Sequence, residues 1–253
     1  MKLYEITFSP TGGTQKAADL LTDALGREIT AVDLTDSRAA FSAIAFTPED
    51  VAVIAVPSYG GRVPRPATER LAAMKGSGAR AVLLCVYGNR AYEDTLVELE
   101  DTAKQAGFRV IAAVTAIAEH SIAHRYAAGR PDAQDAEQLV AFAGKIREKL
   151  SAGDSGKPDI PGSRPYKKAG GSGMVPKPTK ACTGCGLCAE KCPVQAIDPH
   201  DPRRVHKDKC ISCMRCVSIC PQSARKVSSV LLTAVDMALK KACSDRKNGE
   251  LYI

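Results

Sequence analysis

The sequence predicts an α/β protein in which a doubly wound, five-stranded parallel sheet is followed by a small, cysteine-rich α+β domain. Two observations predict this organisation. Apolar strand-like runs alternate with helical patterns through the first 150 residues, whereas eight of the ten cysteines lie between positions 182 and 220. With 253 residues, the chain is long enough for its first part to bury a core of its own.

The first part alternates between two kinds of pattern. Short, uniformly apolar runs such as VAVIAV are typical of strands that are buried on both faces of a sheet. Helical patterns separate most of these runs, which favours parallel strands, right-handed crossovers and helices on both faces. The expected strands are 3–8, 29–34, 51–56, 81–87 and 109–118, and the expected helices are 14–25, 66–75, 91–106 and 132–150.

The first expected strand ends in a loop of small residues that leads directly into a helix. Glycine lets the backbone approach a ligand, hydroxyl groups donate hydrogen bonds, and a helix N-terminus offers free N–H groups with a favourable dipole. The loop is therefore a candidate phosphate site. It has no Walker lysine and no G-x-G-x-x-G pattern, so neither a nucleoside triphosphate nor NAD is indicated. The candidate residues are Ser9, Thr11, Gly12, Gly13 and Thr14.

The S-x-T-G-G-T string of this loop resembles the FMN phosphate loop of flavodoxins. The resemblance implies a flavodoxin-like sheet, in which FMN lies outside the carboxyl ends of the first and third strands. The loops after the third and fourth strands fall at that edge, with Tyr59 as the candidate to stack on the flavin ring. The alternative is a set of ordinary turns on a flavin-free scaffold. The further candidates are Pro57, Ser58, Tyr59, Gly60, Gly61, Tyr87, Gly88, Asn89 and Arg90.

Two copies of one cysteine spacing, C-x2-C-x2-C-x3-C-P, occupy 182–193 and 210–221. Paired C-x2-C units also form zinc sites, and cysteine-rich chains also form disulfide frameworks. Tetrahedral zinc leaves the third and fourth cysteine of each run unexplained, and disulfide frameworks belong to small secreted chains. The doubled, proline-terminated run therefore favours iron-sulfur clusters.

The segment 181–228 resembles the two-cluster bacterial ferredoxins, whose ligand runs have this spacing. The resemblance implies two 4Fe-4S clusters with crossed ligation, in which the cysteine next to each proline binds the other cluster. The first ligand set is then Cys182, Cys185, Cys188 and Cys220, and the second is Cys210, Cys213, Cys216 and Cys192. The remaining two cysteines, Cys85 and Cys243, have no ligand partner.

Composition divides the chain into four parts. Residues 1–150 are the expected flavodoxin-like FMN-binding domain, and 151–180, rich in glycine, proline, serine and lysine, are expected to form a flexible linker. The two-cluster ferredoxin domain covers 181–228. A C-terminal helix, expected at 229–243, and a tail complete the chain as residues 229–253.

Charge is uneven along the chain. Residues 1–150 carry 17 basic and 19 acidic side chains, whereas 151–253 carry 18 basic and 9 acidic ones. Nucleic acid is one possible partner of such a basic half. Each oxidised cluster with its thiolates carries a net charge of about −2, however, and no nucleic-acid motif accompanies the basic residues. Charge compensation and docking of an acidic redox partner are favoured.

Chemistry outside the cofactor loops has few candidates. The loop after the fifth strand places His120 and His124 at the functional edge of the sheet. His120 could donate a proton to a substrate or to reduced flavin, with a solvated loop histidine as the alternative. Lys167 and Lys168 could touch an anionic cofactor, but a flexible tether is the favoured interpretation. The catalytic candidates are therefore His120 and Arg90.

A flavodoxin-like domain followed by a two-cluster ferredoxin resembles the EFR1 family of flavodoxin-ferredoxin fusion proteins. The resemblance implies electron transfer between iron-sulfur centres and flavin. The leading hypothesis is a relay between two 4Fe-4S clusters and FMN. One rival is a ferredoxin-type flavin-dependent reductase of a small acceptor, in which Arg90 and His120 bind and protonate the substrate; another is a ferredoxin carried on a flavin-free docking domain.

The cellular compartment is predicted from what the sequence lacks. The N-terminal segment has neither the basic flank nor the apolar stretch of a signal peptide, and no run has the length of a membrane helix. Reduced thiols and low-potential clusters suit a reducing compartment. We therefore expect a protein of the cytoplasm of an anaerobe.

Overall fold

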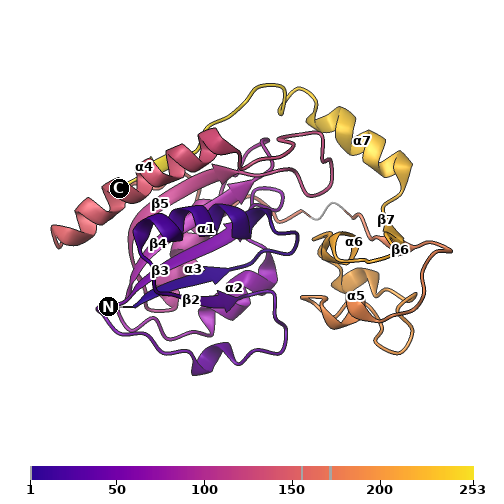
Figure 1. The fold of residues 1–253 in the computed structure, drawn as a ribbon, viewed down its shortest axis with the longest axis horizontal. Coiled ribbons are helices and arrows are strands. Elements are labelled where there is room, and N and C mark those ends of the chain that lie inside the picture. The colour runs from indigo at the N-terminus through magenta and orange to yellow at the C-terminus, as the bar shows by residue number, and fades with distance from the viewer. Residues whose placement is uncertain (1, 155, 171–172) are drawn as a thin grey trace.

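The computed structural model describes residues 2–154, 156–170 and 173–253. Its larger part is a sheet in the order β2-β1-β3-β4-β5-β8 (Figure 1). The first five strands pair in parallel, and their order is that of the flavodoxin-like doubly wound fold. The expected fold class is therefore confirmed. These strands are β1 (Leu3–Thr7), β2 (Ile29–Asp33), β3 (Val51–Pro57), β4 (Arg80–Tyr87) and β5 (Arg109–Ile117).

Helices cover both faces of the sheet, as the sequence predicts. The helices are α1 (Gly13–Leu25), α2 (Arg65–Ala72), α3 (Thr95–Gln105) and α4 (Ala133–Ser151). Leu21 of α1 and Leu139 of α4 belong to one core cluster, and Leu71 of α2 and Leu99 of α3 belong to the other. A single turn at Phe41–Ala43 lies between β2 and β3. In the described part of the chain, no helix combines the length and apolar character needed to cross a membrane.

The C-terminal segment returns to the first domain instead of ending as a free tail. Helix α7 (Ser229–Leu239) is followed by strand β8 (Glu250–Tyr252), which pairs antiparallel with β5 and adds a sixth strand to the sheet. Helix α7 ends four residues before the predicted position 243. A three-residue strand is too short to produce a period-2 pattern, so the sequence analysis missed it.

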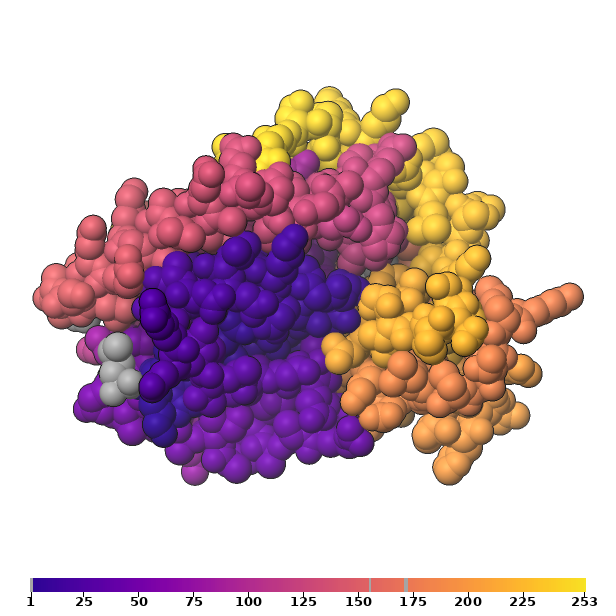
Figure 2. Space-filling model, in the orientation of Figure 1, coloured from indigo at the N-terminus to yellow at the C-terminus, as the bar shows by residue number. Residues whose placement is uncertain are grey.

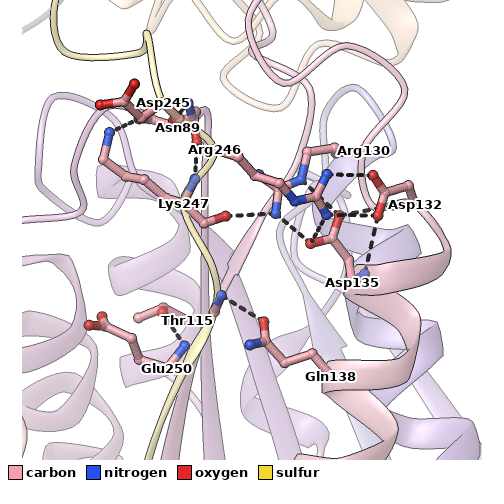
Figure 3. A network of polar contacts seen from close by, with 11 residues as sticks. Asn89, Thr115, Arg130, Asp132, Asp135, Gln138, Asp245, Arg246, Lys247 and Glu250 are labelled. Atoms are coloured by element: carbon pink, nitrogen blue, oxygen red, sulfur yellow. Dashed lines mark hydrogen bonds and ion pairs between the residues drawn. The ribbon is translucent and has the colours of Figure 1, made fainter.

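Polar contacts fix this returning segment in place (Figure 3). The backbone N–H of Gly249 donates to Gln138 Oε1 of α4 at 2.7 Å, and the N–H of Glu250 donates to Thr115 Oγ1 of β5 at 3.0 Å. Arg246 donates to both carboxylate oxygens of Asp132, at the N-terminus of α4, at 2.7 and 2.9 Å. The chain thus leaves the first domain after α4, forms the small domain and then rejoins the first domain.

The small domain lies beside the first domain at the carboxyl ends of the strands (Figures 1 and 2). Among the described residues, Arg70 of α2 donates to the carbonyl of Pro193, Arg215 Nη1 donates to the carbonyl of Ser9 at 3.4 Å, and Arg38 forms an ion pair with Glu190 at 3.9 Å. The elements of the small domain are β6 (Lys177–Pro178), α5 (Leu187–Glu190), the single turn Lys207–Lys209, α6 (Arg215–Ser218) and β7 (Arg225–Lys226).

Between positions 163 and 167 the segment 151–180 packs along the first domain, although the composition predicts a flexible tether. Both carboxylate oxygens of Asp94 accept backbone N–H groups of this segment, from Ser163 at 2.8 Å and from Lys167 at 2.7 Å. Arg164 donates to Asp101 at 2.7 and 2.8 Å. Sequence composition misses these contacts because the acceptors lie on α3 and just before it, more than 60 positions away.

Candidate functional site

A cavity of about 550 Å³ opens at the carboxyl ends of β1, β3 and β4, within the range typical of cofactor pockets. Four parts of the chain form its wall: the loops of the first domain, the linker residues Lys167, Lys168, Gly170 and Met174, the cysteine loop of the small domain and α7. We call it the sheet-edge cavity. Predicted residues in its wall are Thr11, Gly13, Thr14, Pro57, Ser58, Tyr59, Gly60, Tyr87, Gly88, Arg90 and His120.

The loop after β1 has the geometry of an anion site. The Ser9 hydroxyl accepts the backbone N–H of Gln15 at 2.8 Å, which holds the loop against the first turn of α1. Gly12 occupies the N-cap with a φ of 92° and has no side chain to cap the helix, so the Ser9 hydroxyl accounts only for the N–H of Gln15. Because the other N–H groups at a helix start also need acceptors, a helix start beside a cavity suits a phosphate.

The loop after β3 brings Tyr59 next to the small domain. Gly60 and Gly61 both have positive φ, 61° and 84°, and the turn closes with Tyr59 N–H donating to the carbonyl of Arg62 at 2.9 Å. A Cβ atom on Gly61 would lie 1.8 Å from Glu93 Oε2, so only glycine fits there. Burial raises the pKa of Tyr59 well above its usual value, and an electrostatic interaction with Cys213 adds to this shift. Tyr59 therefore lies between the cavity and the second cysteine run.

Two residues of the loop after β4 have different roles. Arg90 is in the cavity wall and forms an ion pair with Glu93 at 2.8 Å. The side-chain amide of Asn89 instead donates to two carbonyls of the returning segment, that of Cys243 at 3.2 Å and that of Asp245 at 2.9 Å (Figure 3). The predicted use of the Asn89 side chain as a flavin donor is therefore replaced by a structural one. Ser9, Gly12 and Gly61 likewise lie beside the cavity wall and not in it.

His120 faces the cavity in its neutral form. Its Nδ1 accepts backbone N–H groups from Ile122 at 3.2 Å and Ala123 at 3.1 Å, which leaves the ring proton on Nε2. Burial lowers the pKa of His120, and the charge of His124 lowers it further. At neutral pH, His120 therefore acts as a hydrogen-bond donor and is a weaker candidate for a proton donor than the sequence predicts. His124 forms an exposed contact with Glu119 at 2.7 Å.

The eight predicted cysteine ligands surround two smaller cavities in the small domain. Cys182, Cys185, Cys188 and Cys220 line one cavity, and Cys192, Cys210, Cys213 and Cys216 line the other. We call these groups the first and second cysteine sets; they are the sets that crossed ligation requires. Within the described residues, no three acidic, histidine or cysteine side chains are grouped closely enough for a single metal ion. In a 4Fe-4S centre each thiolate binds a different iron, and four cysteines around one cavity supply the four ligands that such a cluster needs.

The two cysteine runs repeat one backbone geometry at an offset of 28 positions, from Cys182 to Cys210. The last cysteine of each run accepts a backbone N–H four residues later: Ala196 donates to Cys192 Sγ at 3.3 Å, and Ala224 donates to Cys220 Sγ at 3.2 Å. Such donors favour the thiolate form that binds iron. Positive φ recurs at matching positions, Gly184 with Ser212 and Gly186 with Met214.

Part of the cavity wall was not predicted from the sequence. Ile211 and Ser212, in the loop between two ligands of the second set, lie in the wall of the sheet-edge cavity. The other contributors that were not predicted are Gly170 and Met174 from the linker, Pro10, Val86, Ala118, Glu119, Ser121 and Ile122 from the first domain, and Val235 and Leu239 from α7. Lys167 and Lys168, the possible contacts of an anionic cofactor, also lie in the wall. Only Lys167 and Lys168 carry a sequence signal, their positive charge.

Comparison with known proteins bears mainly on the small domain. Residues 181–225 match the 4Fe-4S dicluster domain family, which supports iron-sulfur binding and an electron-transfer role. The match covers too little of the chain to test the resemblance to the EFR1 family, which stays a prediction. A comparison with curated proteins finds no match.

Among solved structures, the chain is similar to a flavodoxin of Streptococcus pneumoniae, with 21% identity, a TM-score of 0.41, and coverage of 58% of this chain and 99% of that one. The chain is also similar to the oxidised flavodoxin 1 of Bacillus cereus, with 16% identity, a TM-score of 0.43, and coverage of 58% of this chain and 98% of that one. A third similar structure is the two-electron reduced flavodoxin of Megasphaera elsdenii, with 20% identity, a TM-score of 0.40, and coverage of 56% of this chain and 98% of that one. The fold assignment itself rests on the strand order and parallel pairing of β1 to β5.

Proposed function

We propose that the chain is a cytoplasmic electron-transfer flavoprotein that relays electrons between two 4Fe-4S clusters and FMN. One observation carries the proposal. The wall of the sheet-edge cavity contains residues of the candidate phosphate loop after β1 together with Ile211 and Ser212, which lie between two cysteines of the second set. Clusters supply one-electron chemistry, and FMN accepts one or two electrons, so a protein that holds both can link the two kinds of carrier.

Each part of the cavity wall has a distinct role in this proposal. The loop at Thr11 to Thr14 binds the single phosphate of FMN, because it leads into one helix N-terminus whose N-cap residue, Gly12, has no side chain. Tyr59 packs against the flavin ring on the side of the second set. His120, neutral and fixed through Nδ1, donates a hydrogen bond from Nε2. Ile211 excludes water from the gap between the flavin and the second set.

The first cysteine set is suited to an external partner. Cys185 is exposed, whereas Cys192 and Cys213 of the second set are buried. Exposed basic residues Lys180 and Arg203 lie beside the first set, and Arg203 donates to the carbonyl of Cys182 at 3.2 Å. We infer that an acidic redox protein docks there, because complementary charge steers association.

The first experiment tests the flavin site. Thr11→Asp places a carboxylate where the phosphate dianion binds, and like charges repel. We expect loss of FMN binding in a fluorescence titration while iron content is unchanged. Thr11→Val, which is isosteric and neutral, should retain most of the binding. Normal FMN affinity in Thr11→Asp would place the phosphate elsewhere.

The second experiment tests the contact between the second set and the flavin. Ile211 and Thr183 occupy the same position in the two cysteine runs, at the 28-residue offset, but Thr183 is exposed and lies in the wall of the first-set cavity. Ile211→Glu should therefore weaken FMN binding, whereas Thr183→Glu should not. Equal FMN affinities at equal iron content would argue against a flavin next to the second set.

A reductase of a small acceptor is the second candidate, because Arg90, Lys168 and His120 give the cavity polar groups that could hold an anion. General acid catalysis contributes typically about 10²- to 10⁴-fold. Anaerobic reoxidation by small acceptors, compared between wild type, His120→Ala and Arg90→Ala at equal flavin content, separates the candidates. We expect modest changes, since His120 is neutral and Arg90 is paired with Glu93. A loss of about 10²-fold with one acceptor would support the reductase.

A further inference from the structure

Arg225 is a cation in the interior of the small domain. It is 2% exposed and is among the largest fully buried side chains of the described residues. It lies in β7, five positions after Cys220, in the wall of the first-set cavity. Burial of a charge without an anionic partner is costly, so a fully buried guanidinium requires a counter-charge.

The described residues give Arg225 no carboxylate. Its Nη1 donates to the carbonyl of Pro176 at 3.5 Å, and its Nη2 donates to the carbonyl of Pro202 and to Cys188 Sγ, the latter at 3.3 Å. None of the ion pairs among the described residues includes Arg225, and its Nε is buried without a hydrogen-bond partner there. The nearest candidate anion is therefore the thiolate group of the first cysteine set.

The second set has no equivalent of this residue. Arg225 follows the second run, and at the 28-residue offset its position corresponds to Ile197, which follows the first run. Ile197 contributes to the wall of the second-set cavity. Two cations act on the second set: Arg215, which is only partly buried and donates to Ser9, and Arg225 itself, whose charge also acts on Cys210 and Cys216. Among the described residues, however, the sulfur to which Arg225 donates belongs to the first set. Solvent screens the field of a partly exposed charge more than that of a buried one.

We propose that Arg225 is the fixed counter-charge of the cluster at the first set, and that it gives this cluster a higher reduction potential than the cluster at the second set. Reduction adds one electron, supplied by an external reductant, and thus one negative charge, without breaking a bond. A buried cation that also donates to a ligand sulfur stabilises the reduced state, and charge and hydrogen bonds to sulfur are known determinants of cluster potential. This inference rests on the proposed function, in which both sets hold 4Fe-4S clusters.

A higher reduction potential at the first set changes how the relay works. The first electron that the protein accepts resides at the first set, on the exposed side of the small domain and away from the sheet-edge cavity. Electron transfer from the first to the second set is then uphill. The protein therefore holds one electron at the docking face until a second electron or a bound partner changes this balance.

The test is an anaerobic redox titration followed by electron paramagnetic resonance. Arg225→Gln removes the charge but keeps an amide donor, Arg225→Lys keeps the charge, and Lys226→Gln removes an exposed charge from the adjacent position. We expect two one-electron steps in the wild type. In Arg225→Gln the equilibrium constant for the step at the higher potential should fall by at least about tenfold, which lowers the potential of that step by about 59 mV for one electron. The lower step, and both steps in the other two variants, should change less than about threefold.

Iron analysis separates the possible failures. Wild type without about eight iron atoms per chain would contradict the proposed function itself. If Arg225→Gln holds its full iron and titrates as wild type does, or shifts by as much as Arg225→Lys, the counter-charge role is wrong. Loss of iron in Arg225→Gln but not in Arg225→Lys would support that role, because the two variants differ in charge. Equal iron loss in both would overturn it.

Discussion

The two cysteine sets share one ligand spacing but have different surroundings. The first set includes the exposed Cys185, and the buried cation Arg225 lies in the wall of the same cavity. The second set contributes Ile211 and Ser212, in its intervening loop, to a cavity shared with the first domain. The ligand spacing determines that a cluster can bind, whereas the residues between and after the ligands determine which neighbour that cluster has.

The largest expected effect separates the two sets by iron content. Cys192 follows the first run in sequence but lies with Cys210, Cys213 and Cys216 in space. Cys192→Ala should therefore remove the cluster of the second set and reduce iron from about eight to about four atoms per chain. Cys85→Ala, a buried cysteine outside both sets, should retain about eight.

Double variants identify the cluster that remains. Adding Cys185→Ala to Cys192→Ala should remove nearly all iron, whereas adding Cys213→Ala should leave about four atoms, since both changes then affect the same set. Iron and sulfide analysis after anaerobic reconstitution measures this. The reverse pattern would show that ligation is not crossed.

Much of this difference between the sets is invisible to sequence analysis. Strands such as Val51–Pro57 are predicted because uniform apolar character marks a strand buried on both faces. The cysteine sets are predicted because each run repeats a short, fixed spacing. The contact of Ile211 with the sheet-edge cavity has no such signal, since it depends on how two domains pack. The strand at Glu250–Tyr252 is missed for a related reason: pairing with β5 stabilises it, not its own pattern.

The linker allows the contact between the second set and the cavity to be weakened without changing a ligand. Asp94 accepts two backbone N–H groups of the linker, and those hydrogen bonds lower its pKa. A hydrogen bond to a charged group contributes about 1.5–3 kcal/mol. Asp94→Asn, which can accept only one of the two well, should lower the free energy of unfolding by about 2 kcal/mol and weaken FMN binding in a titration.

Asp101→Asn is the matched control for the linker prediction. Asp101 accepts hydrogen bonds from Arg164 and Tyr166 of the same segment, but its side chain is 36% exposed. Exposed ion pairs contribute about 0–1 kcal/mol, so this variant should change unfolding and FMN affinity less. A larger effect of Asp101→Asn than of Asp94→Asn would contradict the role given to Asp94.

The backbones of the two runs are expected to tolerate substitution differently. Gly186 and Met214 occupy the same position and both have positive φ, 79° and 62°. A left-handed conformation costs a residue with a Cβ about 1–2 kcal/mol. Gly186→Ala, with no atom within 4 Å of the added Cβ, should therefore lower the free energy of unfolding by about 1 kcal/mol while iron is retained.

Met214→Ala provides the contrast in the second run. The left-handed strain is already present at that position, so this change removes only the packing of a side chain that is 4% exposed. Truncation of a buried Met costs about 2–5 kcal/mol. Thermal and denaturant unfolding of both variants measures these changes. A loss in Gly186→Ala as large as that in Met214→Ala would mean that the glycine has a role beyond its backbone conformation.

The smallest expected effect is a pH response on the side of the second set. His120, in the wall of the sheet-edge cavity, has a lowered pKa because it is buried, with a smaller effect from His124. Below pH ~6.5 the unfolded chain binds a proton at this histidine, whereas the folded protein does not until its lower pKa is reached. The free energy of unfolding is therefore highest above pH ~6.5. It falls by up to about 1.4 kcal/mol per pH unit as the pH drops from there through the lower pKa of the folded protein.

His120→Gln should flatten this part of the pH profile of unfolding. Ser121→Ala, a change on the same loop without a titratable group, should not. An unchanged slope in His120→Gln would assign the pH response to other groups and would remove the support for a neutral His120 next to the flavin.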